Sequence, residues 1–251
     1  MALDQHLLYG SVGSTLPTSQ NDGTNINSRY SNYGEAYVLP AMPWRHALAR
    51  EGSYFTFFDA TLDLATTVAG HAAPVLADID ATLVKATLFL RNESTNTSKK
   101  FHLDWIKIHV KTAGANGTSA LWAMQIGTTT RYTSGGTDLT VSNPNTESSA
   151  TLTSVLTAKA GPIVIAAENA TSRRIGHGVL RDGIEVAGDS KLFVFGGDPL
   201  QSTIEAASGT FDAINAPPVV LGSGGEFMLG LAGVAQSVAG IYGVSGGGYW
   251  R

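Results

Sequence analysis

Residues 101–111 read FHLDWIKIHVK, and this stretch decides the fold class. Apolar and polar side chains alternate along it, which is typical of a β-strand with one buried face. The apolar residues fall into two sets of different phase: Phe101, Leu103 and Trp105, and then Ile106, Ile108 and Val110. A shift of phase by one residue is what a β-bulge produces, so we expect a bulge between Trp105 and Ile106.

Similar strands are expected on both sides of this stretch. They are residues 53–58, 83–91, 120–126, 161–167, 173–180, 191–197 and 225–232. Turn residues separate them, for example Gly188-Asp189 before the run that begins at Lys191. Many short strands at such intervals predict an all-β body of the β-sandwich or jelly-roll class. Helix is expected only in one turn at residues 47–51 and at residues 151–159, and residues 131–149 are expected to be a long polar loop.

The N-terminal segment, residues 1–52, differs in composition from this body. From Tyr9 to Tyr37 it is dominated by Gly, Ser, Thr, Asn and Tyr, without an apolar period that would bury one face. Such a segment cannot offset its backbone entropy alone, so we expect an extended arm that docks on another surface. The aromatic residues expected to anchor it on a partner are Tyr30, Tyr33, Tyr37 and Trp44.

A glycine-rich end follows the predicted body, which we place at residues 53–235. Residues 236–251 finish on GGGYWR, and we expect a last strand with a short tail that makes a second anchor through Tyr249 and Trp250. No internal repeat of fixed period is visible, which argues against a solenoid or a propeller.

Charge and composition exclude several functional classes. The formal net charge of the 251-residue chain is -4, and the acidic and basic residues of the first 50 positions balance, which argues against a nucleic-acid-binding arm. The absence of cysteine excludes disulfides and thiolate sites. Neither a signal peptide nor a membrane span is apparent, so we expect synthesis in the cytoplasm and no membrane partner.

Three serine or histidine patterns partly match catalytic or metal sites. The segment from Gly243 to Gly247 matches the G-x-S-x-G motif around Ser245, but no His or acidic residue follows it, as a nucleophile elbow requires. Gly188-Asp189-Ser190 is better explained as a turn. His102, Asp104 and His109 share one strand, whereas zinc needs three or four convergent ligands, so we expect a solvated strand face.

Charged clusters elsewhere in the sequence do not indicate a specific binding or catalytic site either. His177 lies near Arg173, Arg174 and Arg181 in the sequence, where an interface salt bridge is the commoner outcome than anion binding. The acidic pairs Asp59/Asp63 and Asp78/Asp80 lack a calcium-loop pattern. The sequence therefore predicts no catalytic residue, no cofactor and no metal site, and a protein that is not an enzyme.

Four features occur together here: a neutral arm rich in Gly, Asn, Ser and Tyr, an aromatic segment after it that contains Pro40 and Pro43, a cysteine-free β body and a glycine-rich aromatic end. In this organisation the chain resembles virion structural proteins of tailed bacteriophages, most of all the auxiliary capsid proteins called decoration or cement proteins. The resemblance implies a jelly-roll or sandwich body, assembled as trimers or dimers, whose arms lie on neighbouring capsid subunits, and localisation in the virion.

Three other functions stay open. The chain is alternatively the main shell protein itself, or a carbohydrate- or receptor-binding module of a tail or appendage. In the second case we expect Trp105, Trp122 or Tyr132 to be exposed as a sugar-stacking platform. A hydrolase using Ser245 or Ser190 is the third alternative.

Overall fold

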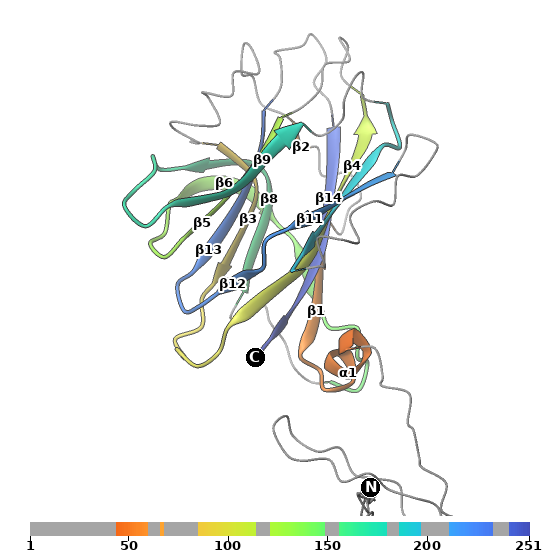
Figure 1. Cartoon of the computed structure of the whole chain (residues 1–251), viewed down its shortest axis with the longest axis vertical. Helices are drawn as coiled ribbons and strands as arrows, with labels where there is room; N and C mark the ends of the chain where they lie inside the picture. Colours follow the sequence, from red (N-terminus) through yellow and green to blue (C-terminus); the bar gives the residue numbers. More distant parts are fainter. Residues whose placement is uncertain are drawn as a thin grey trace, which may run out of the picture. The chain divides into compact units, whose positions relative to one another are not determined.

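The computed structural model describes residues 44–59, 66–67, 85–113, 121–148, 156–179, 186–196, 211–232 and 241–251. Within these ranges nearly all regular structure is β-strand, and the helix α1 (Trp44–Arg50) is short. Two sheets pack into a sandwich (Figure 1), which confirms the predicted all-β class. The compact body begins at Arg45.

The first sheet has eight strands among the described residues. They are β1 (Tyr54–Phe58), β2 (Thr66–Thr67), β4 (Phe101–Thr112), β7 (Thr140–Ser142), β10 (Ser190–Phe195), β11 (Phe211–Ala216), β12 (Val219–Leu221) and β14 (Ile241–Trp250). Six of them lie in the order β11-β10-β4-β14-β1-β7, while β12 pairs with β4 and β2 pairs with β14. Strands β10 and β11 are parallel, and the other described pairs of this sheet are antiparallel.

The second sheet has six strands in the described part of the chain. They are β3 (Lys85–Asn92), β5 (Leu121–Gly127), β6 (Tyr132–Asp138), β8 (Leu156–Ile165), β9 (Arg173–Val179) and β13 (Glu226–Ala232). Their order is β6-β8-β3-β13-β5-β9, and every pair is antiparallel.

The main core lies between the two sheets. Trp122 of β5 packs edge-on against Phe193 of β10, with ring centroids 5.0 Å apart. Phe227 of β13 makes a second edge-on contact, at 5.7 Å, with Phe195 of β10. Because large aromatic side chains bury the most apolar area, these contacts between sheets contribute strongly to the stability of the sandwich.

Strand β4 contains the expected bulge, but one position earlier than predicted. Gly247 of β14 pairs with Trp105 and Gly248 pairs with Leu103, so Asp104 is the extra residue. Leu103 and Ile106 both belong to the core cluster. The side chain of Trp105 therefore faces away from the core, whereas alternation alone grouped Trp105 with Phe101 and Leu103.

The glycine-rich end is a strand inside the first sheet rather than a tail. Residues 241–250 form β14, which pairs with β4 on one side and with β1 on the other. Its glycines lie where side chains of the neighbouring strands cross it. On the core side Gly246 lies under the ring of Phe57 and Gly248 under that of Phe101, and on the opposite side Gly243 lies under the imidazole of His109.

Two further expectations differ from the structure. The predicted helix at residues 151–159 is contradicted from Leu156 onward, because β8 pairs with β3 and with β6. Residues 151–155 lie outside the described residues. The predicted loop at 131–149 contains β6 and β7, whose polar and glycine-rich sequences show no clear alternation. The one-turn helix expected at residues 47–51 is confirmed as part of α1.

Candidate functional site: the anchor of helix α1

Helix α1 is the point at which residues 1–43 join the described body. Its last turn carries Arg50, which suits the negative end of the helix dipole. The amide of Gly52 donates to the carbonyl of Ala49 and that of Ser53 donates to Leu48, the pair of bonds that ends a helix in a Schellman motif. Gly52 has φ 72, which requires glycine there. The chain then turns directly into β1.

At its beginning, the helix is held by an ion pair with the bulged residue of β4. The guanidinium of Arg45 donates two hydrogen bonds to the carboxylate of Asp104, at 2.7 Å from Nε and 2.9 Å from Nη2. The side chain of Asp104 is 2% exposed, whereas that of Arg45 is 48% exposed. Two-point pairing of this kind fixes orientation as well as distance.

Two aromatic side chains complete the surroundings of this carboxylate. The hydroxyl of Tyr54 donates to Oδ2 of Asp104 at 2.7 Å, and Nε1 of Trp105 donates to the Tyr54 hydroxyl at 2.9 Å. Burial and then the Asp104 carboxylate raise the pKa of Tyr54. The hydrogen bonds that Arg45 donates to Asp104 raise the pKa of Arg45. Both donors therefore keep their protons at neutral pH, and the buried charge stays balanced.

The end of the helix is held by the loop after β7. The side-chain amide of Asn143 donates to the carbonyl of Gly52 at 2.8 Å, and that of Asn145 donates to the carbonyl of Arg50 at 3.0 Å. Carbonyls at a helix end lack partners within the helix, so these bonds act as a cap. We call Arg45, Tyr54, Asp104, Trp105, Asn143 and Asn145 the helix anchor.

The six residues predicted to bind partners are only partly placed by the structure. Tyr30, Tyr33 and Tyr37 lie outside the described residues, and Trp44 is the first residue of α1. The other two, Tyr249 and Trp250, lie at the end of β14, next to the start of β1 (Figure 1).

Both C-terminal aromatic rings pack on the first sheet. The ring of Tyr249 stacks on His102 with centroids 4.8 Å apart, and that of Trp250 lies 5.6 Å from Phe101. The backbone amide of Trp250 donates to the carbonyl of Ser53, the residue that links α1 to β1. The end of β14 and the helix anchor are therefore neighbours at one end of the first sheet.

The sequence did not single out the helix anchor, because Arg45 and Asp104 are 59 positions apart. The available signal was Asp104 itself. It lies next to the expected phase shift, and a carboxylate buried at a bulge needs a cationic or hydrogen-bonding partner.

The serine patterns do not have the geometry of a nucleophile elbow. Ser245 lies within β14, opposite Phe58 on β1 and Lys107 on β4, instead of in a turn from strand to helix. The Gly188-Asp189 segment is the predicted turn, in which Asp189 accepts a hydrogen bond from the amide of Val186 at 2.8 Å. Ser190 begins β10.

The histidine and arginine candidates do not converge either. His102 stacks on Tyr249, His109 lies over Gly243, and Asp104 is bound by Arg45 and Tyr54. No group of three His, Asp or Glu side chains within the described ranges gathers as a metal site. Of the remaining candidates, His177 and Arg173 are exposed on β9, and Asp59 is buried after β1. Asp63, Asp78, Asp80 and Arg181 lie outside the described residues.

The predicted sugar platform needs a correction. Trp122 is buried, and its indole packs on the core side beneath Gly176 and Gly178 of β9. Tyr132 is partly buried and lies 5.4 Å from Phe89, centroid to centroid. Trp105 is partly exposed and faces away from the core. Of the three aromatic residues, Trp122 is buried, and Trp105 and Tyr132 are partly exposed.

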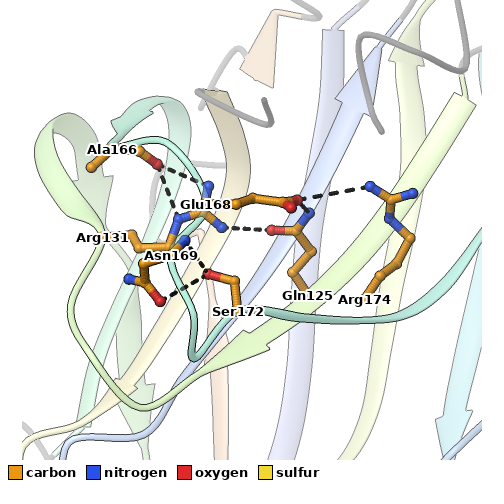
Figure 2. A network of polar contacts seen from close by, with 7 residues as sticks. All are labelled: Gln125, Arg131, Ala166, Glu168, Asn169, Ser172 and Arg174. Carbon is orange, nitrogen blue, oxygen red and sulfur yellow. Dashed lines mark hydrogen bonds and ion pairs between the residues drawn. The ribbon is translucent and has the colours of Figure 1, made fainter. Parts of the chain in front are cut away.

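A second polar network lies on the outer side of the second sheet (Figure 2). Arg131 donates from Nε and Nη2 to the carbonyl of Ala166 and from Nη1 to Gln125, at 2.6 Å in the last case. The amide of Gln125 donates to Glu168, which also lies 3.8 Å from Nη2 of Arg174. The network ties the segments that join β5 to β6 and β8 to β9 to the sheet.

Glu226, the first residue of β13, is the buried acid beside this network. It is fully buried, and its Oε2 accepts the backbone amide of Arg131 at 3.0 Å. Its Oε1 has no hydrogen-bond partner among the residues that the structure describes. Burial raises the pKa of Glu226, while the amide of Arg131 and the charges of Arg131 and Arg91 oppose that rise.

Glu226→Gln is expected to raise the thermal unfolding midpoint at pH 7 by about 2–4 °C. The pKa of Glu226 is higher in the folded than in the unfolded chain, so ionisation as the pH rises above about 4.3 favours unfolding. The neutral amide of Gln removes this destabilisation, and the gain in the unfolding midpoint should disappear near pH 4. Thermal unfolding followed by circular dichroism at both pH values measures it. The exposed Glu147→Gln is the control, and an equal gain at pH 4 would contradict the interpretation.

Among the described residues, no helix has the length and apolar character needed to cross a membrane. Comparisons of this chain with protein-family models, with curated proteins and with solved structures gave no match.

Proposed function

We propose that this chain is a non-enzymatic structural protein of a virus particle, most like an auxiliary capsid protein that stabilises the shell through its N-terminal arm. The observation that carries the proposal is the helix anchor. An ion pair to the buried Asp104 and two side-chain caps fix α1 to the sandwich at the point where a polar segment of 43 residues, which contains four tyrosines, ends.

Physically, an arm fixed at one end adds contacts without enlarging the body. Several weak contacts on one tether act together, because the first contact raises the effective concentration of the next. Force on the arm passes through α1 to β4, a central strand of the first sheet. We therefore expect capsid or other virion proteins as partners, a homo-oligomer such as a trimer or dimer, and localisation in the virion after synthesis in the cytoplasm.

Removal of residues 1–40 is expected to leave a folded body that no longer assembles. The compact unit begins at Arg45, so its thermal unfolding midpoint should stay close to that of the full chain. Light scattering and negative-stain electron microscopy of both proteins would measure oligomers and particles. Particles formed by the full chain alone would favour the main-shell alternative over a decoration protein.

A pair of matched triple variants separates anchoring by aromatic residues from general effects of the arm. Changing the three tyrosines Tyr30, Tyr33 and Tyr37 together to Ala should weaken assembly nearly as much as the truncation does. Changing Asn25, Asn27 and Asn32 together to Ala should leave assembly unaffected. If the truncated chain assembles as well as the full chain, the arm hypothesis is wrong.

A further inference from the structure

Strand β14 joins the two parts of the first sheet that hold helix α1. Among the described strands, β1 pairs only with β14 and β7, and β14 is the strand that pairs with both β1 and β4. Helix α1 precedes β1 directly in the chain, whereas Asp104, which binds Arg45, lies on β4. The two sides of the helix anchor are therefore brought together by the most C-terminal of the described strands.

The middle of the helix anchor lies over Gly247 of β14. A Cβ on this glycine would be 2.7 Å from Nε1 of Trp105 and 3.0 Å from the hydroxyl oxygen of Tyr54. These are the two atoms of the 2.9 Å hydrogen bond that Trp105 donates to Tyr54. The bond therefore crosses the backbone of β14 at a position where a side chain would displace at least one of its two partners.

The backbone of β14 also sets the position of Asp104. Two consecutive glycines of β14 pair with Trp105 and Leu103, which leaves Asp104 as the extra residue of β4. A bulge changes the direction of the side chains around it, so the register of β14 decides where this carboxylate points. Next to the bulge, the amide of Trp250 donates to the carbonyl of Ser53 at 2.9 Å, directly after α1.

We propose that β14 acts as a latch for the N-terminal arm, with Gly247 as the positioning residue. The helix anchor forms only when β14 lies between β1 and β4, because Gly247 leaves room for the bond between Trp105 and Tyr54 and the register of β14 creates the bulge. A chain whose C-terminal strand is not inserted therefore cannot fix its arm. Coupling of this kind is reciprocal, so loss of the anchor also loosens β14. The use of the latch rests on the proposed role of the arm, but the coupling itself does not.

Gly247→Ala in the full chain tests the latch, with Gly243→Ala as the matched control. Both glycines lie on the outward side of β14, and in both cases the atom closest to a Cβ belongs to a ring of β4, that of Trp105 or that of His109. Of these two rings, only that of Trp105 belongs to the helix anchor. The readout is hydrogen exchange at the amides that close α1, which are those of Glu51, Gly52 and Ser53. Exchange there should be about fivefold faster in Gly247→Ala, as for the loss of one hydrogen bond, and should change little in Gly243→Ala.

Trp105→Phe distinguishes positioning by Gly247 from a general effect of alanine in the strand. Phenylalanine is smaller than tryptophan and cannot donate a hydrogen bond to Tyr54, so Gly247→Ala should add little to the exchange of the same amides in this background. A general weakening of β14 would instead add its full effect in both backgrounds. Thermal unfolding of each variant gives the global stability for which the exchange rates are corrected.

The reciprocal effect is measured at the C-terminal strand. Arg45→Gln should speed exchange at the amide of Trp250, which bonds to Ser53, because loss of the anchor loosens β14. Arg50→Gln removes the same charge from the exposed last residue of α1 and should leave exchange at Trp250 unchanged.

Three outcomes would overturn the latch. They are equal exchange at α1 in Gly247→Ala and Gly243→Ala, an effect of Gly247→Ala that is as large in the Trp105→Phe background as in the parent, and unchanged exchange at Trp250 in Arg45→Gln. None of these outcomes would change the expected effect of deleting residues 1–40, so the latch and the structural role fail independently.

Discussion

Gly246→Ala is expected to destabilise the body by about 2–3 kcal/mol, one of the two largest effects that we predict. A Cβ at this position would lie 2.2 Å from Cζ of Phe57 and 2.8 Å from the carbonyl oxygen of Trp105. Phe57 is 1% exposed within the core, and the Trp105 carbonyl belongs to the backbone of the adjacent strand β4. Because close-packed interiors cannot yield by an ångström at low cost, either the ring or the strand pairing must shift.

Gly248→Ala should have an effect of similar size. Its Cβ would be 2.4 Å from the carbonyl oxygen of His102 and 2.5 Å from Cζ of Phe101. Gly243→Ala should cost less although the closest atom is nearer, because that atom belongs to the imidazole of His109, which is partly exposed and can rotate away.

Chemical denaturation of the three variants beside Gly222→Ala would measure these differences. Within the described part of the chain, Gly222 has no heavy atom within 4 Å of the position of a Cβ, so alanine there should be close to neutral. If Gly246→Ala proved as stable as Gly222→Ala, β14 would not lie closely packed between β1 and β4.

These glycines also explain why the end of the chain was predicted to be a tail. Glycine weakens an isolated strand, and a run such as residues 245–248, SGGG, is typical of loops. Here the glycines fit side chains that come from β1 and β4. The strand is therefore specified by side chains of its partner strands, such as Phe57 and Phe101, which lie far away in the sequence.

Strands with a clear alternation were predicted from local pattern, and strands without it were not. Strand β13 and most of β10 follow from their apolar residues. Residues 156–160 contain Ala and Lys, which favour helix, yet they pair with β3 and β6 because their alternate side chains face the core. Tertiary pairing overrides a weak intrinsic preference.

The candidate site was less predictable than the fold. A short helix before β1 and a bulge near Asp104 were both expected from the sequence. Their connection through Arg45 was not, because a salt bridge between distant residues leaves no periodic pattern. A buried carboxylate is a strong sign that a partner exists, but it does not identify that partner.

Asp104→Asn is expected to lower the free energy of unfolding by about 1–3 kcal/mol. The change keeps the volume but removes the charge that Arg45 and Tyr54 share. Breaking a fully buried ion pair costs about 3–5 kcal/mol, and the effect here should be smaller because the Arg45 side chain is 48% exposed and regains water. The main loss is the poorer acceptor for the buried hydroxyl of Tyr54.

Asp138→Asn is the matched control. Its carboxylate also forms an ion pair, at 2.6 Å from Lys159, but Asp138 is 78% exposed. Exposed pairs contribute about 0–1 kcal/mol, so this variant should be nearly as stable as the parent. Equal effects of the two substitutions would show that the buried position of Asp104 has no special role.

A local readout tests whether the ion pair holds helix α1. Hydrogen exchange at the amides of Glu51, Gly52 and Ser53, which close the helix, should be faster in Asp104→Asn than in Asp138→Asn. The increase in exchange rate should exceed the increase that the lower global stability of Asp104→Asn would cause by itself. If exchange follows global stability only, the pair contributes to the fold but does not fix the helix, and the mechanical argument for the arm would be lost.

The same variant should alter the alkaline limb of the stability curve. Burial and the Asp104 carboxylate raise the pKa of Tyr54 above the value near 10 of an unfolded tyrosine. Its contribution to stability is therefore complete below about pH 10 and is lost as the pH rises toward the folded pKa, because the unfolded chain releases the proton first. In Asp104→Asn the carboxylate no longer raises this pKa, so the loss is smaller. Denaturation curves of parent and variant should therefore converge above about pH 10, and parallel curves would contradict the assignment.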